Sequence, residues 1–187
     1  MIQQNKYANL TYPAFFAALT VIMSFISIPL PFNPVPITGQ TLAVMLTGSI
    51  LSVRQAGWSI LTYLLIGAVG LPVFSGFSGG IGVLLGPTGG YLLAYFPGVM
   101  LIALLKGKNN KIWPLALANI IGGIGVVYLV GVTWLSVFTG MGIQKAMMVG
   151  ALPFIPGDII KLGMATVLGR EINKRLFRGI YPAKGGQ

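Results

Sequence analysis

The chain has 187 residues, of which 55% are apolar and only 7% are charged, whereas a soluble domain carries about a quarter charged residues. Its formal charge of +10 does not indicate a nucleic-acid-binding face, because the basic residues stand at the ends of apolar runs. The absence of Cys and His excludes disulfides and His- or Cys-ligated metal sites. Two acidic residues, Asp158 and Glu171, are too few for a carboxylate metal cluster or for general acid–base catalysis, so we expect no metal, no cofactor and no enzyme.

Three stretches, 7–53, 55–105 and 112–144, contain no charged residue, and each exceeds the roughly 20 apolar residues that cross a bilayer. The proline-rich stretch 29–36 and the glycine-rich stretch 70–90 interrupt the first two runs. We therefore expect an all-α integral membrane protein, a single transmembrane domain over 1–187, with 184–187 outside the fold. Its six transmembrane helices are expected at about 11–29, 40–53, 55–70, 88–105, 112–137 and 153–175.

The positive charges agree with six spans. One side of the membrane then carries Lys6, Arg54, Lys106, Lys108, Lys111, Arg170, Lys174, Arg175, Arg178 and Lys184, the other carries Lys145, and Lys161 lies within the membrane. Cytoplasmic loops carry an excess of Lys and Arg, so both termini are expected in the cytoplasm. The first ten residues are too polar for a signal peptide, so we expect the first span to be retained.

The second-helix start and the first helix offer weaker signals. In the stretch 34–41, Gln40 lies at membrane depth, which favours a binding role, while Thr38 or Thr41 can serve as a helix cap. On the first helix, Ala14 and Ala18 form a small-x-x-x-small pattern that lets another helix approach closely. Such patterns also serve packing within one chain.

The glycine-rich residues 67–90 match neither phosphate-binding loop pattern, so the chain has no recognisable ATP site of its own. Apolar residues in this stretch, among them Phe74 and Phe77, are atypical of an exposed linker. We interpret the stretch as a lid over a small ligand. A flexible outer loop is the alternative, since glycine alone would also produce one.

Asp158 and Lys161 are the sharpest feature of the sequence. They are opposite charges three residues apart, on one face of the last helix and inside an apolar run. Charges within a membrane are costly and face the bundle interior or a cavity, so the pair is predicted to form a binding site. The alternative is a neutralised pair that only fixes helix packing.

Four stretches together resemble the BioY family, the biotin-binding membrane subunits (S components) of energy-coupling-factor (ECF) transporters. They are Pro-Val-Pro-Ile-Thr-Gly-Gln-Thr at 34–41, Gly-Ala-Val-Gly-Leu-Pro-Val-Phe at 67–74, Gly-Pro-Thr-Gly-Gly-Tyr at 86–91 and Phe-Ile-Pro-Gly-Asp-Ile-Ile-Lys at 154–161. The resemblance implies six helices, cytoplasmic termini and a biotin pocket on the outer side of the bacterial cytoplasmic membrane. It also implies a transmembrane coupling protein, docked at Ala14 and Ala18, and two cytoplasmic ATPase subunits.

Biotin has a ureido group, an apolar thiophane ring and a carboxylate on a short chain. Asp158 can accept from a ureido N–H, and Lys161 can donate to the ureido carbonyl or to the carboxylate, which leaves the orientation open. The start of the fourth helix can bind an anion, aromatic rings can pack on the ligand, and the fifth helix presents Tyr128 at the depth of Asp158. The predicted binding residues are Asp158, Lys161, Gln40, Thr41, Phe77, Gly89, Gly90, Tyr91 and Tyr128, with Trp134 as a further ring contact.

A second functional hypothesis is a stand-alone facilitator or ion-coupled transporter of a small vitamin-like solute. In that case Asp158 would be the group that carries the proton or ion. Proteoliposomes containing only this chain separate the two hypotheses, since only the second allows the substrate to accumulate without partners or ATP.

Overall fold

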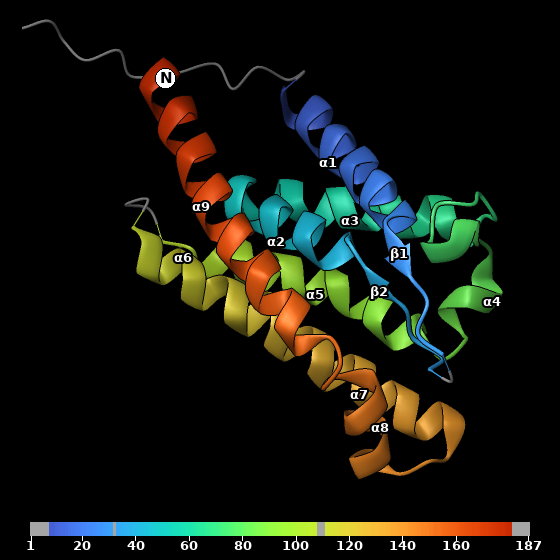
Figure 1. The fold of residues 1–187 in the computed structure, drawn as a ribbon. Helices are drawn as coiled ribbons and strands as arrows, with labels where there is room; N and C mark the ends of the chain where they lie inside the picture. Colours follow the sequence, from blue (N-terminus) through green and yellow to red (C-terminus); the bar gives the residue numbers. More distant parts are fainter. Residues whose placement is uncertain (1–7, 32, 108–110, 181–187) are drawn as a thin grey trace, which may run out of the picture.

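The fold is that of a computed structural model, which describes residues 8–31, 33–107 and 111–180. The expected tail at 184–187 and the basic residues Lys6, Lys108 and Lys184 lie outside these ranges. The chain forms a bundle of helices with one short strand pair (Figure 1). The structure thus agrees with the helical class predicted from the sequence.

Five of the expected helices correspond to single helices of the structure. They are α1 (Ala8–Phe25), α2 (Gln40–Ile50), α3 (Val53–Ala68), α5 (Gly89–Leu105) and α9 (Ile155–Ile180). The fifth expected helix is a continuous run of α6 (Ile112–Ala118), a π-helical segment η2 (Asn119–Val126) and α7 (Val127–Thr139). This long helix ends at Gly140, whose left-handed backbone is a common helix stop.

Several elements were not predicted. They are the strands β1 (Ser27–Ile28) and β2 (Ile37–Thr38), the one-turn 3₁₀ helix η1 (Ser75–Phe77), α4 (Ile81–Leu84) and α8 (Ile143–Gly150). The prediction that the first helix extends to residue 29 is wrong, since α1 ends at Phe25 and the chain enters β1. There Ser27 pairs with Thr38 and Ile28 with Ile37 in antiparallel register, which folds the proline-rich turn back over the end of the bundle.

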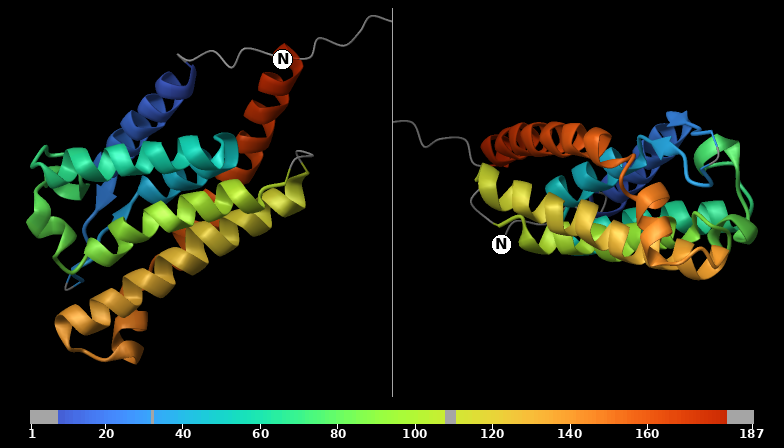
Figure 2. Two further views of the ribbon diagram at one scale, coloured as in Figure 1. Left: turned by 180° about the vertical axis from the view of Figure 1, so that it is seen from behind. Right: turned by 60° about the horizontal axis from the view of Figure 1, so that its bottom comes forward.

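Helix packing places α2 and α5 at the centre. α2 packs against both α9 and α5, while α3 packs between α1 and α5. Figure 2 shows the long helix α6–η2–α7 running beside α5 and α8 turning back at its end, and all three parts of the long helix contact α5. Ser52 and Gln55 form a capping box that starts α3 directly after α2. The two helices therefore reverse direction within a few residues.

By length and composition, one helix within the described residues, Ile112–Thr139, is long and apolar enough to cross a membrane. Ile143–Gly150 and Ile155–Arg175 would together make a second such span, bent by 57°. Shorter apolar helices lie at Leu10–Phe25, Gln40–Ile50 and Gly89–Leu105.

Candidate ligand-binding cavity

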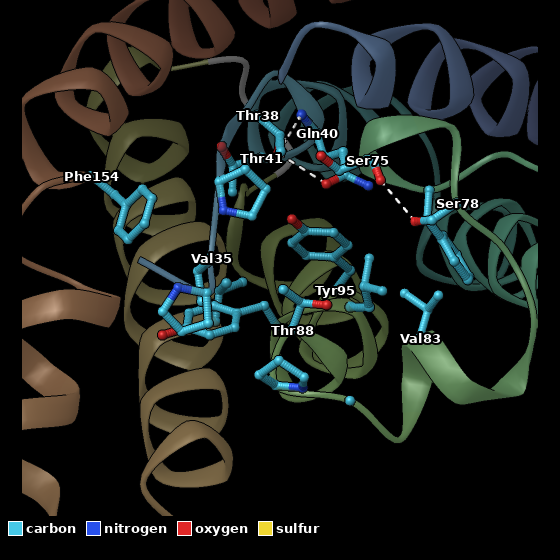
Figure 3. A pocket seen from close by; sticks show the side chains of 18 of the residues that line it. Val35, Thr38, Gln40, Thr41, Ser75, Ser78, Val83, Thr88, Tyr95 and Phe154 are labelled. Carbon is cyan, nitrogen blue, oxygen red and sulfur yellow. Dashed lines mark hydrogen bonds between the residues drawn. The ribbon is translucent and has the colours of Figure 1, made fainter. Parts of the chain in front are cut away.

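A cavity of about 390 Å³ lies at the end of the bundle that carries the strand pair. Its walls come from the proline-rich turn, from α2, α5, α7 and α9, and from the segment 71–88, which we call the covering segment. In Figure 3, Phe154 and Val35 lie on one side of the cavity and Ser78 and Val83 on the other, with Tyr95 between them. A cavity of this size suits a small organic ligand.

Asp158 and Lys161 meet at the cavity wall. Lys161 Nζ lies 2.8 Å from Asp158 Oδ1, and Asp158 is only 3% exposed. Thr41 connects the two, since its hydroxyl accepts from Lys161 at 2.9 Å and donates to Asp158 Oδ1 at 3.2 Å. The hydroxyl of Tyr128 donates to the other carboxylate oxygen, Oδ2. Thr41 and Tyr128 thus hold a charge pair whose carboxylate is buried, and the four side chains come from three helices.

Local structure explains how these groups come together. Asp158 lies in the first turn of α9, where a helix stabilises negative charge, and Lys161 follows one turn later on the same face. Thr41 is the second residue of α2, and the β1–β2 pair fixes where that helix begins. α7 supplies Tyr128, whose hydroxyl contacts Asp158 directly. Asp158 and Thr41 are therefore set by helix starts, while Tyr128 comes from within the continuous helix α6–η2–α7.

A second, neutral polar group lies beside the charge pair. Gln40 is 3% exposed and donates its amide N–H to the hydroxyl of Tyr63. Thr38 donates to the Gln40 amide oxygen at 2.9 Å. These bonds hold the Gln40 side chain in one orientation, so it offers a fixed polar surface to the cavity.

Hydrogen bonds and one buried ring attach the covering segment to the bundle. The Ser24 hydroxyl donates to Val73 O at 2.7 Å, and the Ser27 and Ser75 hydroxyls are 2.6 Å apart. Phe74 is 1% exposed and packs edge-on against Tyr63. The segment therefore closes one side of the cavity in this structure.

The structure brings six of the nine predicted binding residues to the cavity. They are Asp158, Lys161, Gln40, Thr41, Tyr91 and Tyr128. Phe77 is 68% exposed and stacks on Phe25 instead.

Gly89 and Gly90 do not line the cavity either, because they pack against Leu84 and Trp134. Trp134 does not line the cavity in this structure, and it donates its indole N–H to Gly86 O at 2.9 Å. Ala14 and Ala18, the predicted docking residues, are exposed on α1.

Sequence reasoning missed several lining residues. Tyr95 follows Tyr91 by one helical turn on α5, so helix periodicity could have found it. Phe154, Ser75 and Ser78 also line the cavity. Ser75 and Ser78 lie in and just after the one-turn helix η1, and Phe154 directly precedes α9, so no periodicity indicates which way these side chains face.

Comparison with known proteins agrees with this architecture. The model of the BioY family matches residues 1–178. A biotin transporter BioY from Thermotoga maritima is 41% identical over 160 residues, covering 85% of this chain and 92% of that protein. One from Rhizobium etli is 39% identical over 173 residues, covering 88% and 92%.

A solved structure has the same fold. It is the crystal structure of the S component for biotin from an ECF-type ABC transporter, which superimposes with a TM-score of 0.84 at 32% identity. The match covers 93% of this chain and 95% of the other. The family match and the structural match thus agree with the cavity, which is of a size to hold a small organic ligand.

Proposed function

The chain belongs to the BioY family, and from this premise we propose that it binds biotin in the cavity as the substrate-binding membrane subunit of an ECF-type importer. One observation carries the assignment of the site: a buried, neutralised Asp158–Lys161 pair lies in the cavity wall. The relatives are named as transporters, so the chain is a transport protein and not an enzyme.

The hydrogen-bonding capacity of the pair fits a cyclic urea. Among the described residues, the Lys161 ammonium donates to Thr41 and Asp158, which leaves one of its three N–H groups for a ligand. Asp158 accepts two bonds at Oδ1 and one at Oδ2, which leaves one lone-pair direction at Oδ2. One spare donor and one spare acceptor match the neighbouring carbonyl and N–H of a ureido group.

Charge also favours the ureido group of biotin, and not its carboxylate, at the Asp158–Lys161 pair. A ligand carboxylate placed at the pair would lie beside the buried Asp158 carboxylate and be repelled by it, whereas a ureido group is neutral. The thiophane ring can then pack on Tyr91, Tyr95 and Val35, which line the cavity. We therefore place the ureido end at Asp158 and Lys161.

Titration of the purified chain tests the assignment. Biotin should bind, while thiamine and riboflavin, which lack biotin's five-membered cyclic urea, should not. Biotin amide, which has no carboxylate charge, should keep most of the affinity if the ureido group meets the pair. Binding of riboflavin or thiamine in place of biotin would overturn the proposal.

The membrane arrangement is part of the proposal. We propose six crossings of the bacterial cytoplasmic membrane, made by α1, α2, α3, α5, the long helix and α9, with both termini in the cytoplasm. The lopsided distribution of Lys and Arg supports this orientation. Cysteines introduced near Lys6 and near Lys145 should be labelled by an impermeant reagent only at the second position in intact cells.

We also propose that a transmembrane coupling protein docks on α1 and that two ATPase subunits supply the energy. Ala14 and Ala18 are exposed on that helix, which leaves room for close approach by another helix. Ala14→Trp or Ala18→Trp should prevent co-purification of the coupling protein while biotin binding stays intact. Co-purification equal to that of the native chain would contradict this docking face.

A further inference from the structure

A second polar cluster joins the same three helices at the other end of the bundle. Asn119, at the start of η2, donates to the Ser49 hydroxyl of α2 at 3.1 Å and to the Thr166 hydroxyl of α9 at 3.3 Å. The Ser49 hydroxyl lies 3.2 Å from the Asn119 amide oxygen. Asn119 and Ser49 are fully buried, and Thr166 is 5% exposed. None of the three lines the cavity, so this cluster, which we call the clamp, does not touch a ligand there.

On each of the three helices, the clamp residue lies about two turns from the residue that contributes to the binding site. Eight residues separate Thr41 from Ser49 on α2, and eight separate Asp158 from Thr166 on α9. Eight residues of α-helix make about 12 Å and a little over two turns. On the long helix, nine residues separate Asn119 from Tyr128, which is one residue too many for the same rotation.

The π-helical segment accounts for the extra residue. Nine residues of uninterrupted α-helix turn through about two and a half turns, which would leave Asn119 and Tyr128 on opposite faces. Residues 119–126 are π-helical, with bonds from residue i to i+5 that take up one additional residue. The nine residues of the long helix then turn through about the same angle as eight residues of regular α-helix. Both Asn119 and Tyr128 therefore face α2 and α9.

We infer that Asn119 is a positioning residue for ligand binding, which holds the long helix at the rotation and height that place Tyr128 on Asp158. The inference rests on the proposed function of the cavity. Asn119 acts through Tyr128 and not by contact with the ligand. Removing its side-chain bonds should therefore weaken binding only as long as the Tyr128 hydroxyl is present.

The test measures biotin affinity for Asn119→Leu alone and combined with Tyr128→Phe. We expect Asn119→Leu to lower the affinity about tenfold, equivalent to about 1.4 kcal/mol, and to add nothing in the Tyr128→Phe background. Thr166→Val, which removes only the bond to α9, is a milder second variant for use if Asn119→Leu does not fold. Losses that simply add in the double variant, or an unchanged affinity, would overturn the inference.

Thr47→Val is the matched control. Thr47 is fully buried on α2, but its hydroxyl bonds to Ala43 O of its own helix and, among the described residues, links no other helix. The control should change melting temperature without changing affinity. A fall in affinity like that of Asn119→Leu would mean that any buried hydroxyl matters equally, which overturns a specific role for the clamp.

A ligand-free measurement separates failure of the inference from failure of the proposed function. Spin labels at Leu129 and Ile159, both exposed neighbours of the Tyr128–Asp158 contact, report the distance between α7 and α9. Asn119→Leu should broaden or shift this distance, and Thr47→Val should not. If the native chain binds no biotin, the proposed function fails, and an unchanged distance in Asn119→Leu would overturn the clamp independently.

Discussion

The helical wall of the cavity and the covering segment use glycine in opposite ways. In the wall, a Cβ added at Gly131 would lie 2.3 Å from the Tyr91 ring, and one at Gly90 would lie 2.2 Å from Trp134. In the covering segment, Gly76 and Gly80 have positive φ angles, and an added Cβ would meet no atom of the described residues within 4 Å. Gly131 and Gly90 make room for aromatic side chains, whereas Gly76 and Gly80 supply backbone conformations that other residues rarely adopt.

This difference indicates that the two regions have different mechanical roles. Tyr91 is locked between helices, because its ring fills the space over Gly131 and its hydroxyl donates to Gly150 O at 2.7 Å. The covering segment is attached mainly through Phe74, Ser75 and backbone bonds to α3. We therefore expect the wall to be preformed and the covering segment to order around the ligand, and each variant below tests one side of this contrast.

The largest effect is expected in the wall, at Asp158. Asp158→Asn keeps the shape but removes the anion that Lys161 needs, which typically costs about 1.5–3 kcal/mol and up to about 5 when a buried charge is left unpaired. Biotin affinity should fall between about tenfold and a thousandfold. The check is a biotin titration and a ligand-free melting curve on the same preparation.

Glu171→Gln is the matched control for Asp158→Asn. It removes the chain's other carboxylate, which is half-exposed and lies 3.9 Å from Lys174. Affinity and melting temperature should both stay at the native values, because exposed ion pairs contribute little. If Asp158→Asn lowers only the melting temperature while the folded protein binds biotin normally, the charge pair is structural.

The charge pair also shows what could be predicted from the sequence. Asp158 and Lys161 stand out because charges are rare in an apolar run, and Tyr128 follows from its expected depth on the fifth helix. Phe74 and Phe77 could not be told apart, since they lie in a glycine-rich stretch without periodicity. In the structure Gly76 and Phe77 both have positive φ, and this reversal of the chain leaves Phe77 outside the cavity while Phe74 is buried.

The π-helical segment sets another limit to prediction. The run 112–137 is apolar throughout, so its hydrophobic pattern gives no hint of one additional residue in a turn. Only the hydrogen-bond partners of Asn119 and Tyr128 show where the rotation changes. The existence of the helix was therefore predictable from its composition, while the orientation of its polar residues depended on packing against α2 and α9.

The next largest effect is expected at Gly131. Gly131→Ala forces the methyl group against the Tyr91 ring, and overpacking of this kind typically costs about 1–3 kcal/mol. The melting temperature should fall without ligand present, and affinity should fall with it because Tyr91 lines the cavity. Gly163→Ala is the control, since a Cβ there meets no atom within 4 Å in the part of the chain that the structure describes, and it should not lower the melting temperature.

In the covering segment, Gly80→Ala should act on ligand release more than on stability. Gly80 has φ +95° and ψ 159°, a region that costs other residues about 1–3 kcal/mol. Because the segment can open locally without unfolding the bundle, biotin dissociation should accelerate several-fold while the melting temperature changes little. A large loss of melting temperature would show that the covering segment is as rigid as the wall.

The smallest effect is expected at Phe77, which sequence reasoning placed at the ligand. Its ring stacks on Phe25 with centroids 4.6 Å apart, and the side chain is 68% exposed. Aromatic pairs are worth about 0.5–1.5 kcal/mol beyond their burial, and this one holds the covering segment against α1 from outside.

Phe77→Ala should therefore speed biotin dissociation only a few-fold, and Phe25→Ala should produce the same change, because either substitution removes the same stack. Stopped-flow displacement of bound biotin measures both rates. A tenfold or larger effect of Phe77→Ala, with Phe25→Ala unchanged, would mean that Phe77 turns inward onto the ligand when the segment closes.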